Sequence, residues 1–160
     1  MEANTKIDLS ALNDQQKEAV TSENKRLLVL AGAGSGKTKT LLQKLIYLIE
    51  EKGVSPSSIL AITFTKNATN EMIDRLIISA DNTGDYEKLL FDKRISKVEK
   101  DRERYLQQKK YKWIDGLTVK TFHSFCYSIL RNYGVNEFDN KFRIIGDEKK
   151  DEEGELSKHV

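Results

Sequence analysis

A glycine-rich segment near the start of the chain holds the residue types that a nucleotide-phosphate site needs. Residues 31–38 read AGAGSGKT. The last three match the P-loop pattern G-x-x-x-x-G-K-[ST], and Ala31 stands at its first position. Glycines let successive N–H groups turn toward a phosphate at a helix N-terminus. Lys37 can then neutralise the β- and γ-phosphates, and the Thr38 hydroxyl can ligate Mg²⁺.

The pattern therefore predicts a site for a nucleotide with Mg²⁺, whereas the alternative is an ordinary glycine turn. Lys37 and Thr38 are the catalytic candidates, and Thr38 is the candidate metal ligand. The predicted nucleotide contacts of the loop are Ala31, Gly32, Ala33, Gly34, Ser35, Gly36, Lys37 and Thr38.

The segments on either side of the loop have the apolar patterns of a strand and a helix. Residues 26–31 are a short continuous apolar run, typical of a strand that is buried on both faces. Asn13 can cap a helix over residues 14–21 ahead of this strand. After the loop, apolar residues recur at helical spacing, namely Leu41, Leu42, Leu45, Ile46 and Ile49. The order is strand, glycine loop, helix.

Two further strand–helix units follow, which indicates a mainly parallel α/β sheet. Residues 59–64 predict a buried strand, and the next helix has the apolar face Met72, Ile73, Leu76 and Ile77. Residues 117–121 predict another strand, and the next helix has the stripe Phe122, Phe125, Cys126, Ile129, Leu130 and Tyr133. A last strand is predicted at residues 142–145.

Residues 81–116, between the second and third units, hold 10 basic and 8 acidic residues. We expect a projecting helical insertion with two solvated faces. One interpretation is a spacer stabilised by ion pairs between successive helical turns. The other is a contact with nucleic acid or a partner protein through Lys109, Lys110, Lys112 and Trp113.

The composition excludes several classes of protein. The 160 residues carry a formal net charge of +2, with 32% charged and 38% hydrophobic residues. One cysteine excludes a disulfide framework and a cysteine-rich zinc site. No apolar run approaches the length of a membrane span, and residues 1–10 have no signal-peptide core. We expect a cytoplasmic protein without a membrane partner, ending in an acidic tail at residues 147–160 that is a frayed helix or disordered.

Four segments, in the correct order, resemble motifs of the UvrD/Rep/PcrA family of superfamily 1 DNA helicases. Residues 12–20 follow its form L-N-x-x-Q-x-x-A-V, and the loop at 31–38 has the family's alanine in first place. Residues 64–72 resemble F-T-N-K-A-A-x-E-M, and residues 121–126 resemble T-F-H-S-x-C. The resemblance implies a P-loop NTPase (RecA-like) fold, with residues 1–146 as a partial ATP-binding domain 1A that includes the helical insertion. It also implies use of ATP and Mg²⁺ and 3′ to 5′ translocation on single-stranded DNA.

The resemblance also implies roles for particular residues. Gln16 stands where the family reads the adenine edge, and Lys39 stands where an arginine lies near the nucleotide. The implied contacts with single-stranded DNA are Phe64, Thr65, Lys66, Thr121, Phe122 and His123. An aromatic face can stack on a base while hydroxyls and a lysine hold phosphates. Without the resemblance, Phe64 and Phe122 would be assigned to the core, and Cys126 remains a packing residue.

Hydrolysis in this family also needs an acidic pair that holds Mg²⁺ and activates water, and arginines from a second RecA-like domain. Asp147 and Glu148 follow the strand expected at 142–145, but that strand is short and contains Arg143, so we do not assign them as the pair. We expect an N-terminal part of a helicase without domains 1B, 2A and 2B, which binds nucleotide but does not unwind DNA. The length of the insertion is more like that of RecB- or AddA-type relatives.

Two other functions are compatible with the residues. One is a non-catalytic module that binds nucleic acid or a partner through the charged insertion. The other is a small P-loop kinase, which would need a lid with arginines and an acceptor site. No such arginine cluster is visible in the sequence.

Overall fold

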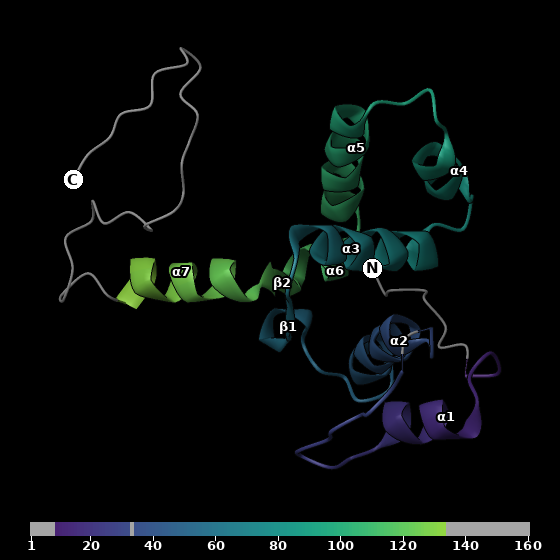
Figure 1. The fold of residues 1–160 in the computed structure, drawn as a ribbon, viewed down its shortest axis with the longest axis vertical. Coiled ribbons are helices and arrows are strands. Elements are labelled where there is room, and N and C mark those ends of the chain that lie inside the picture. Colours follow the sequence, from purple (N-terminus) through teal and green to yellow (C-terminus); the bar gives the residue numbers. More distant parts are fainter. Residues whose placement is uncertain (1–8, 33, 134–160) are drawn as a thin grey trace. The chain divides into compact units, whose positions relative to one another are not determined.

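The computed structural model describes residues 9–32 and 34–133 (Figure 1). The chain divides into two compact units, Met1–Phe122 and His123–Val160. The elements of the first unit are α1 Asp14–Thr21, α2 Lys37–Glu50, the 3-10 turn η1 Pro56–Ser58, β1 Leu60–Thr63, α3 Lys66–Ala80, α4 Asp85–Phe91, α5 Lys97–Lys110, α6 Lys112–Gly116 and β2 Thr118–Thr121. Helix α7, Phe122–Tyr133, belongs to the second unit apart from its first residue.

Strands β1 and β2 form a small parallel sheet. Leu60 is opposite Thr118, and Thr63 is opposite Thr121. The strands expected at 59–64 and 117–121 are therefore confirmed, as is their parallel direction. Because the strands are parallel, the residues that follow them leave the sheet at the same edge.

The core lies between α3 and the elements packed around it. The predicted apolar face of α3 is confirmed, since Met72, Ile73, Leu76 and Ile77 are all buried. Leu42 and Leu45 of α2 pack into the same cluster. Leu41, which was also expected on the buried face of α2, is instead 45% exposed.

The strand expected at residues 26–31 is absent from the part of the chain that the structure describes. Residues 27–30 have no regular secondary structure, and Leu28 and Leu30 are 82% and 86% exposed. A buried strand needs neighbouring strands for its backbone N–H and C=O groups. The two described strands pair with each other, and neither pairs with this segment. An apolar run alone could not reveal this.

Parts of the insertion at 81–116 pack into the core, which the expectation of a projecting element did not include. Tyr86 of α4 and Ile114 of α6 are buried in the core, and Trp113 packs against it. In Figure 1, α4 and α5 lie on one side of α3, and α1 and α2 lie on the other. The expected helical character of the insertion is confirmed by α4, α5 and α6, and the expected solvated character is confirmed for α5, which has no buried residue.

Helix α7 forms where the sequence predicts it, but its apolar stripe is not a buried one. Phe122, Ile129 and Leu130 are exposed, and Phe125 and Cys126 are half-buried. Burying such a stripe takes a second element, and α7 is the only element described in its unit. The strand expected at 142–145, the pair Asp147 and Glu148, and the tail at 147–160 lie outside the described residues. No helix in the described part is long and apolar enough to cross a membrane.

An ion pair joins the insertion to α3 across 30 residues of sequence. Arg104 Nε lies 2.6 Å from Asp74 Oδ1, and the two side chains are only 13% and 16% exposed. The Tyr86 hydroxyl donates to the same carboxylate at 2.5 Å. Burial, together with this hydrogen bond to Asp74, raises the pKa of Tyr86.

Removing the arginine should cost more than removing a surface charge. Arg104→Ala leaves the Asp74 carboxylate in a mostly buried position without its cation, and we expect it to lower the free energy of unfolding by about 2–4 kcal/mol. Arg102→Ala is the matched control, because Arg102 lies on the same helix and is exposed. Urea denaturation followed by circular dichroism measures both variants. Equal midpoints for the two would mean that the ion pair does not hold the insertion in place.

Candidate functional site

The glycine loop lies directly before α2, and two of its glycines adopt the left-handed conformation. Gly34 has φ +74° and Gly36 has φ +80°. A Cβ on Gly36 would come within 2.8 Å of Gln16 Nε2. Position 36 therefore requires glycine for its backbone angles, whereas the contact with Gln16 involves only the end of a flexible side chain.

Lys37, the first residue of α2, folds back over the loop. Its ammonium group donates to the carbonyl oxygens of Ala31 at 3.1 Å and Gly32 at 2.6 Å. The Ser35 hydroxyl also donates to the Gly32 carbonyl, at 2.8 Å. The cation is thus held beside the backbone of the loop.

Gln16 connects α1 to this loop. Its backbone N–H donates to Asn13 Oδ1 at 2.9 Å, and its own Oε1 accepts from the Asn13 N–H at 3.1 Å, which forms a capping box. Its Nε2 donates to the Ser35 carbonyl at 3.0 Å. The predicted Asn13 cap and the helix over 14–21 are confirmed. The hydrogen bond from Gln16 to Ser35 was not predicted. The capping box was open to prediction, because an Asn followed three residues later by a Gln is its sequence signal.

Two lysines of α2 donate hydrogen bonds to backbone carbonyls at or next to the ends of α1. The Lys39 ammonium donates to the Ala11 carbonyl at 2.7 Å, so it is directed at the segment before α1. The Lys44 ammonium donates to the carbonyls of Val20 and Ser22, at the end of α1. Burial lowers the pKa of Lys44. Lys44 was not singled out in the sequence, because a lysine on an amphipathic helix carries no local signal of such a role.

The remaining residues of the predicted nucleotide set lie on the loop or in the first turn of α2. Ala31, Gly32 and Gly34 are exposed, and Thr38 is half-buried as the second residue of α2. Ala33 lies outside the described residues. The structure therefore brings Gln16, the loop and Lys37 together, while Lys39 is bonded to Ala11.

The predicted DNA contacts of the first unit gather where both strands end. Phe64 follows β1 and is 94% exposed, so it is not a core residue. Thr65 caps α3 by accepting from the Ala68 N–H at 3.1 Å, and Lys66 begins that helix. Thr121 ends β2 at the same edge, opposite Thr63.

Phe122 follows Thr121 and is 55% exposed. The edge of the sheet therefore presents two aromatic side chains to solvent. His123 is the first residue of the second unit.

Comparison with known proteins agrees with the motifs. A sequence model of the UvrD/REP helicase N-terminal domain matches residues 12–159. A probable DNA helicase II homolog of Mycoplasma capricolum is 34% identical over 86% of this chain and 15% of its own length. The ATP-dependent DNA helicase UvrD1 of Mycobacterium leprae is 38% identical over 78% of this chain and 12% of its own length.

The ATP-dependent DNA helicase PcrA of Staphylococcus aureus is also 38% identical, over 77% of this chain and 13% of its own length. The chain therefore spans only 12–15% of the length of these three relatives.

Proposed function

The chain belongs to the UvrD/REP helicase N-terminal domain family, and on this premise we propose that it is the ATP-binding part of domain 1A of an ATP-dependent DNA helicase. In this proposal residues 1–146 belong to a RecA-like P-loop domain that includes the insertion at 81–116, and residues 147–160 are a tail. The helicase translocates 3′ to 5′ on single-stranded DNA, and domains 1B, 2A and 2B act with it. The observation that carries the proposal is the glycine loop beside Lys37 at the start of α2.

The residues present fit the phosphates of ATP. Gly36 caps α2 without any side-chain hydrogen bond, so the first N–H groups of the helix can point at an anion. Lys37 is bonded to two neutral carbonyls of the loop. Phosphate oxygens are stronger acceptors for an ammonium group, because the hydrogen bond is charge-assisted. Thr38 would contribute its hydroxyl to Mg²⁺, which when bound neutralises charge on the phosphates.

The edge at which β1 and β2 end supports contact with single-stranded DNA. The exposed ring of Phe64 is in contact with water in the isolated chain, which is unfavourable for an apolar group. The same ring can stack on any of the DNA bases. Lys66 supplies a neighbouring cation for the DNA backbone. The T-F-H segment at residues 121–123 is the second part of the proposed DNA contact.

Gln16 provides a test of which nucleotide the site accepts. If its amide reads the adenine edge, Gln16→Ala should weaken ATP binding more than GTP binding and so flatten the preference. Gln15→Ala is the matched control, because Gln15 is the neighbouring glutamine, its side chain is exposed and it takes no part in the capping box. Titration calorimetry with both nucleotides measures the ratio of affinities.

The opposite result has a definite structural meaning. Gln16 already bonds to Asn13 and to the Ser35 carbonyl, so its loss could loosen the loop for every nucleotide. An equal loss of ATP and GTP affinity would reject adenine recognition and leave Gln16 as the residue that positions the loop.

A further inference from the structure

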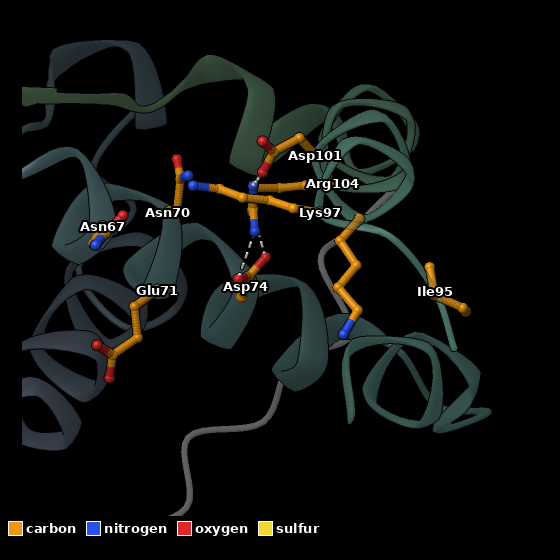
Figure 2. A pocket seen from close by; sticks show the side chains of 9 residues that line it. Asn67, Asn70, Glu71, Asp74, Ile95, Lys97, Asp101 and Arg104 are labelled. Carbon is orange, nitrogen blue, oxygen red and sulfur yellow. Dashed lines mark hydrogen bonds and ion pairs between the residues drawn. The ribbon is translucent and has the colours of Figure 1, made fainter. Parts of the chain in front are cut away.

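A polar cleft of about 330 Å³ lies between α3 and α5. Figure 2 shows it from close by, with Arg104 of α5 meeting Asp74 of α3, while Lys97 and Glu71 extend away from this pair. Helix α3 contributes Asn67, Asn70 and Asp74, and α5 contributes Lys97, Lys100 and Arg104. On each helix these residues are spaced by three or four positions, so each set forms one face of its helix.

The acidic groups of the cleft are paired. Arg104 binds Asp74 through two hydrogen bonds and also binds Asp101 (Figure 2). Glu71 binds Arg75 at 2.8 Å, one turn along α3. Because Arg104 serves both Asp74 and Asp101, the formal charges of the lining balance only when the two lysines are counted, with three carboxylates against three cations.

The two lysines of the cleft are not paired in this way. Within the described part of the chain, the side chains of Lys97 and Lys100 make no hydrogen bond or ion pair, and neither do the amides of Asn67 and Asn70. Two cations and two amide groups therefore line one cleft with their donors unused. Such donors match the phosphate oxygens of a nucleic-acid backbone.

The cleft begins next to the proposed DNA contact. Asn67 directly follows Lys66 at the N-terminal end of α3, so a strand that contacts Phe64 and Lys66 reaches the cleft within the first turn of that helix. The Asp74–Arg104 ion pair holds α5 against α3, so the lysines are presented from a fixed position.

We propose that the cleft between α3 and α5 binds the phosphodiester backbone of single-stranded DNA and extends the contact made by Phe64 and Lys66. This inference rests on the proposed DNA-binding function. It assigns the insertion a binding role through Lys97 and Lys100. The surface around Lys109 and Trp113 fits this role less well, because Lys109 is paired with Asp115 at 2.8 Å and Trp113 packs against the core.

The test compares two double variants that each remove two positive charges from the insertion. Lys97→Ala with Lys100→Ala removes the cleft cations, and Lys93→Ala with Arg102→Ala is the control, because both residues are exposed in the insertion and lie outside the cleft. Fluorescence anisotropy with labelled oligo-dT of about 16 nucleotides, the upper range of single-strand sites, measures affinity across a salt series. Unchanged Mg-ATP affinity and thermal melting confirm that each variant is folded.

We expect the cleft variant to bind the oligonucleotide about tenfold more weakly at low salt, while the control changes less than about twofold. The slope of log affinity against log salt should become shallower by about 1.4, since each lost phosphate contact removes about 0.7 for single strands. Lys97→Arg with Lys100→Arg should retain the affinity. Equal losses in the cleft and control variants would overturn the proposal, because the effect would then be one of net charge.

Phe64→Ala separates this inference from the function on which it rests. If Phe64→Ala weakens DNA binding and the cleft variant does not, the cleft assignment fails and the proposed DNA contact stands. If DNA binding is insensitive to Phe64→Ala and to the cleft variant, the proposed DNA function fails as well. Poly-glutamate is the probe for an acidic protein partner. If its binding depends on the two cleft lysines while the DNA affinity of the cleft variant is unchanged, the cleft binds an acidic protein and the proposal is wrong.

Discussion

Steady-state hydrolysis of Mg-ATP by this chain alone is expected to be about 10³- to 10⁵-fold slower than by a P-loop enzyme whose catalytic arginine is in place. Lys37 and Thr38 can position phosphates and metal, but charge also develops on the transferred γ-phosphoryl group. In the proposed helicase, the arginines that stabilise this charge belong to a second RecA-like domain. The chain spans only 12–15% of the length of the three relatives described above.

A coupled ATPase assay, with and without single-stranded DNA, measures this rate. Asp147→Asn and Glu148→Gln are the informative variants, because they alter the acidic pair that we did not assign to catalysis. Turnover near the ~1–10³ s⁻¹ of typical enzymes that either substitution abolishes would contradict the expectation. It would identify Asp147 and Glu148 as the carboxylates that hold Mg²⁺ and activate water.

Lys37→Ala is expected to weaken the binding of Mg-ATP by about 10- to 150-fold. A charge-assisted hydrogen bond contributes roughly 1.5–3 kcal/mol, and about 1.4 kcal/mol corresponds to a tenfold change in affinity. The wild-type ammonium already lies beside the loop, within 3.1 Å of two of its carbonyls, so little rearrangement is needed to meet a phosphate.

Titration calorimetry compares this variant with Lys25→Ala, which removes the same charge from an exposed position outside the loop. The control should bind Mg-ATP as the wild type does. Equal affinities for all three proteins would remove the assignment of the loop as a phosphate site.

The helices were predictable because their signals are local. The Asn13 cap, the apolar face from Met72 to Ile77 and the glycines before Lys37 can each be read within a few residues of sequence. The position of the glycine loop directly before α2 was predictable for the same reason, since its residues are consecutive. Local rules for capping and periodicity are sufficient in these cases.

The failures concern contacts between distant residues. The segment 26–31 has the composition of a buried strand, but it has no ladder partner among the described residues, and Leu28 and Leu30 are exposed. The insertion is joined to α3 by the contact of Arg104 with Asp74, 30 positions away. The sequence indicated the charges of the insertion and could not indicate which of them meet across space.

The proposed chemistry of the site also depends on such a distant contact. Gln16 was predicted as a base contact from its motif, whereas its bond to the Ser35 carbonyl, 19 positions away, joins α1 to the loop. Periodicity and motif spacing do not encode a contact of this kind. This contact depends on how α1 packs against α2 in the folded chain.

The most direct test of nucleotide binding by the glycine loop is a titration of the ¹⁵N-labelled chain with Mg-ATP, followed by NMR. We expect saturable shifts in the backbone amide signals of Gly32, Gly34, Gly36 and Lys37, because these N–H groups form the proposed phosphate site. Arg102, exposed on α5, should be unaffected. The absence of saturable shifts at the loop, or shifts confined to other parts of the chain, would contradict the claim that this loop binds the nucleotide.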